Sequence, residues 1–286
     1  MSHTPDRTPE QDGGGRRSMA LIAAVVFVAV LIAAGTIVLV TRGGDDHGAK
    51  PTAPPTPSSA PPGPGTATGF GIPETDPFGR RIDMPNNAYG QPLEQTAPHR
   101  EPGDPEWLTA APAGTRGPGA KGGWQRVYGA VVPFSASDGP TRIQDGVPTG
   151  YAHTPQGAAL AAAFLMWETA ARPADRPLRE RMVVMSANDL AEFDRLKAAG
   201  KLPDRRPDSE TRYMLAPDAF RIRSWADDLC VVELATRTEP DKTGTPRWLG
   251  NQLAMVWDGS GWRMRLAADQ KLPQEALASL AGWTPW

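Results

Sequence analysis

His153 is the side chain in this sequence best suited to acid–base chemistry. The other three histidines lie in the tail or linker, whereas His153 comes two residues before Pro155, where we expect a helix to begin. The dipole of that helix disfavours an imidazolium at its N-terminus, so His153 would act as a neutral base if Glu168 or Asp189 lay beside it. A lone histidine in a loop more often packs or forms a hydrogen bond, and we predict no catalytic residue.

The other polar motifs are typical of turns rather than of reactive sites. The acidic pair at 227–228 and the acidic residues between 204 and 210 would hold a cation only if the fold assembled them, and charged turns explain both. The run GGGR at 13–16 lacks the lysine, the hydroxyl residue and the strand of a phosphate loop. We expect no metal ion, no cofactor and no enzymatic activity.

Cysteine content and charge exclude further classes of protein. The single cysteine, Cys230, cannot form an internal disulfide framework, a zinc ribbon or a CxxC redox pair. It alternates with Val232 and Leu234, which is typical of a buried apolar thiol, and pairing with another chain is the alternative. A net charge of -2 with scattered basic residues gives no footprint for nucleic acid, so we expect no nucleic-acid partner.

Residues 19–40 form an uncharged apolar run of 22 residues with arginines close to both ends. As a helix this run is about 33 Å long, enough to cross a hydrocarbon core of about 30 Å. A cleaved secretory signal is the alternative, but the run is longer than the apolar part of such a signal, and no small-residue cleavage site follows. Because the arginine pair before the run favours a cytoplasmic N-terminus, we predict a single-pass protein of the cell membrane with a cytoplasmic tail at 1–18 and an extracytoplasmic C-terminal domain.

About half of the 30 glycines and 31 prolines are concentrated between this run and Trp124, in less than a third of the chain. Residues 41–69 are rich in Pro, Thr, Ser and Gly and predict a disordered linker that holds the next domain away from the bilayer. Residues 70–123 stay irregular but regain apolar side chains. We interpret them either as further linker or as an extended segment that lies on the folded domain or docks on a partner. The candidate docking residues are Phe70, Ile72, Phe78, Arg80, Arg81, Ile82, Met84 and Tyr89.

The remaining residues, 124–286, have the composition of a folded domain. We expect a buried helix at 155–172 capped by Thr154, a short helix at 178–185, and another after the capping box at 186–189. Alternating residues predict strands at 124–133, 212–215, 220–225, 229–236, 251–257 and 262–266, and a last short helix is expected at 272–280. Helices followed by antiparallel strands predict an α+β domain, with helices packed on one face of a curved antiparallel sheet.

This order of elements over 124–275 resembles the NTF2-like or cystatin-like fold. The run GYAHTPQGAALAAAF at 150–164, after Trp124 and the Val-Val-Pro at 131–133, is similar to a family of single-pass actinobacterial membrane proteins, some of them associated with integrative and conjugative elements. The layout of tail, single helix, Pro-rich tether and external domain also resembles the VirB8-type assembly factors of conjugation and type IV secretion. The resemblance implies a scaffold in a mating or secretion channel that binds protein partners or its own copies, and it carries over no site residue.

Two other functions stay open at this point. A cell-surface ligand-binding module requires an apolar cavity between helices and sheet, lined by residues such as Phe164, Trp167, Met255 and Trp257. An NTF2-like enzyme requires His153 beside an acid inside that cavity.

Overall fold

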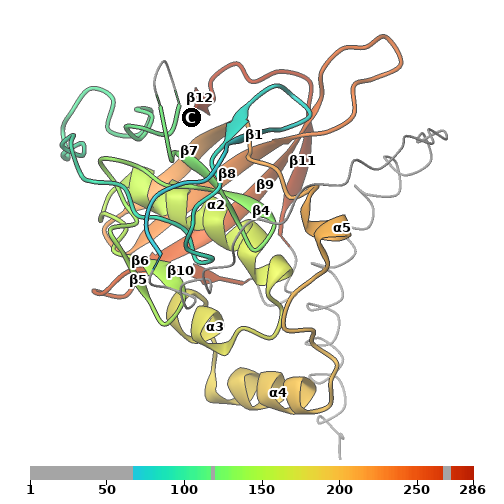
Figure 1. Cartoon of the computed structure of the whole chain (residues 1–286). Coiled ribbons are helices and arrows are strands. Elements are labelled where there is room, and N and C mark those ends of the chain that lie inside the picture. Colours follow the sequence, from blue (N-terminus) through green and yellow to red (C-terminus); the bar gives the residue numbers. More distant parts are fainter. Residues whose placement is uncertain (1–66, 117–119, 267–271) are drawn as a thin grey trace, which may run out of the picture.

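The computed structural model of the chain describes residues 67–116, 120–266 and 272–286. Its main sheet is built from β7 (Ala219–Ala226), β8 (Leu229–Arg237), β9 (Trp248–Trp257), β10 (Trp262–Arg265), β11 (Gln274–Leu277) and β12 (Thr284–Pro285). The strands are antiparallel in the order β10-β9-β8-β7-β12, and β11 also pairs with β9 (Figure 1). β10 pairs with the second half of β9 and β11 with the first half, so these two lie along one edge of the sheet.

Three two-stranded sheets are also present among the described residues. They are β1 (Glu74–Thr75) with β2 (Arg81–Ile82), β3 (Trp124–Val127) with β4 (Ala130–Pro133), and β5 (Arg142–Gln144) with β6 (Val147–Thr149). The single strand expected at 124–133 is therefore a hairpin. Tyr128 and Gly129 both have positive φ, 46° and 90°, which suits the two central residues of a tight hairpin turn.

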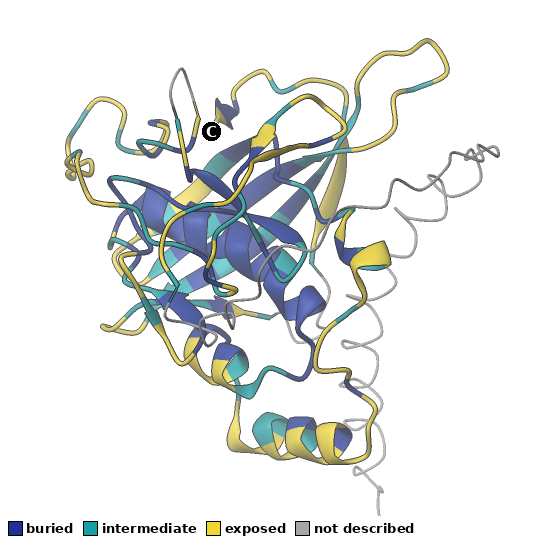
Figure 2. Ribbon diagram, viewed as in Figure 1, coloured by how far each residue is buried: buried dark blue, intermediate teal, exposed yellow. Residues whose placement is uncertain are grey.

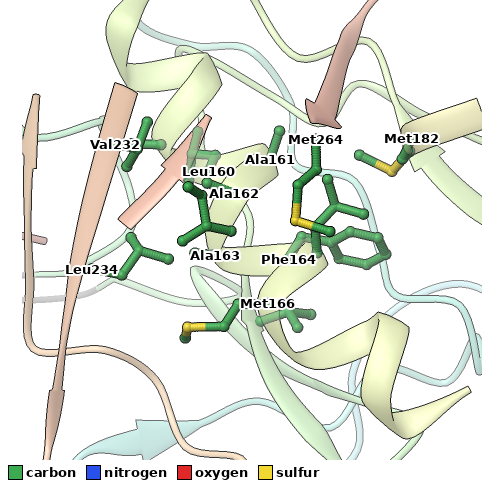
Figure 3. Close-up of a cluster of buried hydrophobic side chains, with 14 of the residues drawn as sticks. Leu160, Ala161, Ala162, Ala163, Phe164, Met166, Met182, Val232, Leu234 and Met264 are labelled. Carbon is green, nitrogen blue, oxygen red and sulfur yellow. The ribbon is translucent and has the colours of Figure 1, made fainter. Parts of the chain in front are cut away.

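Helix α2 (Pro155–Ala171) confirms the expected buried helix and its cap. The Thr154 hydroxyl accepts a hydrogen bond from the Gly157 amide, and Pro155 occupies the first turn. All residues of α2 except Trp167 are buried, because the helix contacts β4 as well as β7, β8, β9 and β10 of the main sheet (Figure 2). Figure 3 shows side chains of α2 among those of β8 and β10. A helix covered on every side needs no polar face.

The other helices are short. α3 (Arg176–Met182) contacts β6 and β10, and α4 (Ala187–Ala198) begins with the expected capping box, formed by Ser186 and Asp189. The buried face of α4 packs in a separate small cluster, apart from the main core and away from the sheet in Figure 1. A single turn, α5 (Asp208–Thr211), stands next to 212–215, where a strand was expected.

The predicted NTF2-like or cystatin-like α+β fold is wrong. The described residues are mostly antiparallel strands with few short helices, and α4 does not join a helical layer over the sheet. The last expected helix, at 272–280, is instead strand β11, which pairs with β9 from Gln274 to Leu277. Local sequence favoured a helix there, but an open sheet edge offered a full set of backbone partners, and tertiary context outweighs such weak propensities.

Residues 67–116 lie against the rest of the described chain. The amide of Asp83 donates to the carbonyl oxygen of Trp124 at 2.8 Å, and the Arg126 amide donates back to the Asp83 carbonyl oxygen at 3.0 Å. Gln91 and Gln125 exchange hydrogen bonds between side chain and backbone, each 2.7 Å long. This part of the chain therefore extends the hairpin of β3 and β4.

Within the described residues, none of the helices combines the length and apolar character that a membrane crossing requires. The expected cytoplasmic tail, the apolar run at 19–40 and most of the linker lie outside these residues.

Candidate functional site

Five aromatic side chains gather at one end of the main sheet, and we call them the aromatic cluster. They come from the segment before α2, from both sides of the β9–β10 turn, from the end of β7 and from an irregular loop. The members are Trp107, His153, Trp225, Trp257 and Trp262.

His153 lies flat on one of these rings. Its imidazole is stacked on Trp257, with ring centroids 4.3 Å apart and planes 13° apart, and it lies 5.9 Å from Trp225 and 5.6 Å from Trp262. Its Nε2 atom is 2.5 Å from the carbonyl oxygen of Asp227. The side chain is exposed, so it forms part of the surface of the cluster.

Trp262 is the buried support of the cluster. It is only 2% exposed, and its indole N–H donates to the carbonyl oxygen of Ala152 at 2.8 Å. The rings of Trp257 and Trp225 meet it at 5.2 and 5.6 Å, both edge to face, and Trp107 meets Trp225 at 5.3 Å. The outer three tryptophans are half-buried. The end of the sheet thus presents large aromatic surface on rings that their neighbours hold in place.

A polar cavity of about 270 Å³ adjoins the cluster. Trp262 and the β9–β10 turn border both of them, and the hairpin of β5 and β6 and helix α3 form the other walls. Its charged lining residues are Arg142, Glu180, Arg181, Asp258 and Arg263.

Asp258 holds the turn between cluster and cavity. Its carboxylate accepts hydrogen bonds from the Ser260 amide and hydroxyl and from the Gly261 amide. Partial burial works against ionisation, but these hydrogen bonds and Arg263 outweigh it and lower the pKa of Asp258. The wall of the cavity is therefore a fixed turn that carries a negative charge.

The opposite end of β9 carries a different assembly, which we call the aspartate clamp. The buried carboxylate of Asp218 accepts from Arg80 at 2.6 Å, from Arg237 at 2.6 Å and from the indole N–H of Trp248 at 2.7 Å. Arg80 also pairs with buried Asp76 at 2.5 Å. The clamp ties the turn between β1 and β2 to the main sheet.

Some of the candidate docking residues lie against the chain itself. Ile82 is 1% exposed within the main core, while Phe70, Met84 and Tyr89 are half-buried. The ring of Tyr89 lies 5.8 Å from that of Tyr128. These four side chains therefore take part in the packing of segment 67–116.

The other four candidates are divided between ion pairs and solvent. Arg80 belongs to the aspartate clamp, and Arg81 pairs with Asp83 at 2.6 Å. Ile72 is 88% exposed and Phe78 is 39% exposed. The guanidinium of Arg237 lies 4.8 Å from the Phe78 ring, so Phe78 borders the clamp, and the eight candidates do not form one continuous surface.

The structure does not bring an acid to His153 from either position that the sequence offered. Glu168 is fully buried and pairs with Arg172 at 2.7 Å, and Asp189 caps α4. Burial raises the pKa of Glu168 to about 7, against the opposing effect of Arg172. His153 therefore has aromatic and backbone neighbours, which suit binding rather than proton transfer.

Several other reactive groups are engaged or buried, whereas the acidic pair at 227–228 and Asp204 are exposed. Burial raises the pKa of the Cys230 thiol to about 12. Asp208 and Glu210 pair with Arg205 and Arg206. Across the described ranges, no group of three or more His, Cys, Asp or Glu side chains is placed to hold a metal ion.

The residues named for an apolar cavity lie mostly in packed surroundings. Phe164 and Met255 are 0% exposed members of the main core, and the Trp167 indole donates to the carbonyl oxygen of Leu215 at 2.8 Å. Trp257 belongs to the aromatic cluster. The cavity described above is lined by other residues.

Sequence reasoning singled out His153 but missed its aromatic neighbours. Trp225 and Trp262 were treated only as strand residues, and Trp257 was named only as a lining residue of an apolar cavity. The signal was their position, since Trp257 and Trp262 flank the DGSG turn directly and Trp225 precedes the turn between β7 and β8. Tryptophans at the ends of strands, next to polar turns, are expected to keep part of their rings exposed to solvent.

A family model described as a domain of unknown function, DUF8175, matches residues 83–285, more than half of the chain. The chain belongs to the DUF8175 family. Comparisons with curated proteins and with solved structures give no match. The matched region begins at Asp83, where the chain joins β3, and it includes all five members of the aromatic cluster and the whole lining of the cavity.

Proposed function

We propose that this protein is a membrane-anchored extracytoplasmic scaffold that binds a partner protein through the aromatic cluster. The observation that carries the proposal is the stack of His153 on Trp257, with half-buried Trp107 and Trp225 beside it. Tryptophan is one of the residues enriched among those that dominate binding energy at protein interfaces, and it contributes most when its ring is held in place before binding.

The cluster supports binding more strongly than catalysis. Proton transfer by His153 needs an acid or base partner in reach, whereas the contact made by its Nε2 atom is with a backbone carbonyl oxygen. Rings fixed by Trp262 lose little conformational freedom when a partner covers them. The arrangement therefore favours an interface.

The apolar run at 19–40 supports a membrane anchor, and the arginines before it support an extracytoplasmic position for residues 67–286. This layout fits a component of a conjugation or secretion apparatus. That part of the proposal rests only on the order of tail, anchor and tether in the amino-acid sequence. The partner is either another component of the apparatus or a second copy of this chain.

Photocrosslinking in intact cells tests the proposal. A photoreactive amino acid at position 107, 225 or 257 of the full chain should crosslink to one defined protein, while the same amino acid at position 248 should not. In the background of a Trp225→Ala Trp257→Ala variant, the crosslink from position 107 should fall at least tenfold, because each ring contributes as a main anchor.

Trp248→Ala is the matched control, since Trp248 is also a half-buried tryptophan of β9 but belongs to the aspartate clamp. This variant should keep the crosslink from position 107. Equal crosslinking from positions 107 and 248, or no crosslink from the cluster at all, would contradict the proposal.

A further inference from the structure

The polar cavity beside the aromatic cluster contains three arginines from three separate elements. Arg142 belongs to β5, Arg181 to α3 and Arg263 to β10. Three guanidinium groups repel one another, so a fold that brings them to one cavity needs negative charge to offset them.

Arg263 is held mainly by uncharged groups. Its Nη2 atom donates to the carbonyl oxygens of Glu180 at 2.9 Å and Val183 at 2.8 Å. The nearest carboxylate, that of Asp258, is 3.4 Å from its Nη1 atom. The Nε atom is buried and has no hydrogen-bond partner among the described residues. The guanidinium is thus fixed in direction while one donor remains unused.

Arg181 and Arg142 differ in how far they are neutralised. Arg181 pairs with Asp145 beside the cavity. Arg142 is exposed, and its side chain forms no ion pair or hydrogen bond with any residue that the structure describes. It is the arginine of the cavity that is free to take a new partner.

The charges of the lining leave a positive excess. Arg142, Arg181 and Arg263 face two lining carboxylates, Glu180 and Asp258. Glu180 is itself 3.2 Å from Arg176, a cation outside the lining. Arg176 also pairs with Asp194 at 2.9 Å, and Arg181 pairs with Asp145, so counting these outer partners balances the charges. The positive excess therefore belongs to the lining itself, where Arg142 is the guanidinium without a carboxylate partner.

We propose that this cavity binds a small anion bearing a carboxylate or phosphate group, with Arg142 as its main contact. The planar fork of arginine donates two parallel hydrogen bonds to either group. A volume of about 270 Å³ holds such an anion with a few further atoms, slightly below the range of about 300 to 1,000 Å³ typical of larger ligands. The buried ring of Trp262 and the side chains of Tyr151 and Met182 supply apolar wall for those atoms.

Isothermal titration of the full chain with inorganic phosphate, and separately with citrate, tests the site. Saturable binding of at least one of the two anions is expected, and the comparison tells which group the site prefers. Arg142→Ala should weaken that binding at least tenfold. Arg142→Lys should weaken it less, because the charge stays while the fork is lost.

Arg265→Ala is the matched control. Arg265 lies on β10 two residues from Arg263, is exposed, and does not line the cavity. Its loss removes the same charge from the same face and should change binding less than twofold. The melting temperature of each variant is recorded. Since the Arg142 side chain has no ion-pair or hydrogen-bond partner among the described residues, its variants should melt like the unmodified chain.

Two results would overturn the inference. One is the absence of saturable heat with both phosphate and citrate. The other is equal weakening by Arg142→Ala and Arg265→Ala, which would show a general attraction of anions to the surface instead of a site.

Discussion

Strand β9 begins with Trp248 and ends with Trp257, two half-buried tryptophans roughly 30 Å apart. At the first end, the indole N–H and two arginines all donate to one buried aspartate. At the second end, the indole lies flat against an exposed imidazole, beside a cavity with an unpaired arginine. The same residue types bind one another at one end of the sheet and remain available to a partner at the other.

The difference lies in where the carboxylates stand. Asp218 is buried where its two oxygens reach Arg80, Arg237 and Trp248 together, so both carboxylate oxygens are occupied. Asp227, beside the aromatic cluster, contacts His153 through its backbone carbonyl and not through its carboxylate. Residue types alone therefore do not distinguish a structural cluster from a binding surface, whereas hydrogen-bond saturation does.

The largest loss of stability is expected from a substitution in the aspartate clamp. Asp218→Asn removes a buried negative charge from two arginines and should lower the free energy of unfolding by about 3 to 4 kcal/mol. Asp227→Asn, an exposed position in the turn between β7 and β8, should change it by less than about 0.5 kcal/mol. Denaturant unfolding of the full chain in detergent, followed by tryptophan fluorescence, measures both. A similar cost for the two variants would remove the distinction between the ends.

An exposed and a buried titratable residue near the two ends of α2 should also differ in how they affect the pH dependence of stability. His153 precedes α2 and is exposed, whereas Glu168 near its end is buried with a pKa raised from 4.5 to about 7. Because the folded state then binds this proton more tightly than the unfolded chain, the free energy of unfolding should fall as pH rises from about 4.5 to about 7, by at most about 3 kcal/mol.

Melting curves at a series of pH values check this. Glu168→Gln should flatten the fall between those limits, and His153→Gln should retain it. A fall that persists in Glu168→Gln would assign the pH dependence to another group.

The smallest expected effect compares the two tryptophans directly. Trp248→Ala leaves Asp218 without one donor and should cost about 2 kcal/mol, while Trp257→Ala exposes ring surface that is already partly solvated and should cost about 1 kcal/mol. Chemical unfolding of the two variants side by side gives the difference. If Trp257→Ala proved the more costly, the aromatic cluster would belong to the core and the binding proposal would lose its main support.

Local signals predicted the local parts of this fold. The cap at Thr154, the proline after it and the capping box at 186–189 each depend on a few consecutive residues, and α2 and α4 begin where those signals stand. Strands β7, β8, β9 and β10 also lie near their expected positions, because alternation within one strand is visible in the sequence.

The arrangement of these elements was not visible in the same way. Residues 274–277 form a strand only because β9 has an open edge, and 124–133 turn back on themselves at Tyr128 and Gly129. Gly129 also allows close approach, since a Cβ atom there would lie 1.9 Å from the Thr211 hydroxyl. Contacts between distant residues decided both cases.

The candidate site shows the same limit. His153 was identified by its type and by its place before a helix, and it does lie in the aromatic cluster. Its neighbours Trp107, Trp225 and Trp257 come from three other segments, and only the folded sheet brings them together. Arg142 has no motif around it, and its role follows from the absence of a partner in the described structure.

The burial of α2 on every side sets conditions on how the chain folds. The helix is covered by β4, which precedes it, and by four strands that follow it. Its contacts with β8, β9 and β10 join residues more than fifty positions apart. Such separations slow folding, because long loops must close before the contacts form. In any intermediate that has only one of the two covers, an alanine-rich apolar strip of α2 faces solvent and is prone to aggregate. We therefore expect that β4 and the main sheet pack on α2 in a single cooperative step of folding.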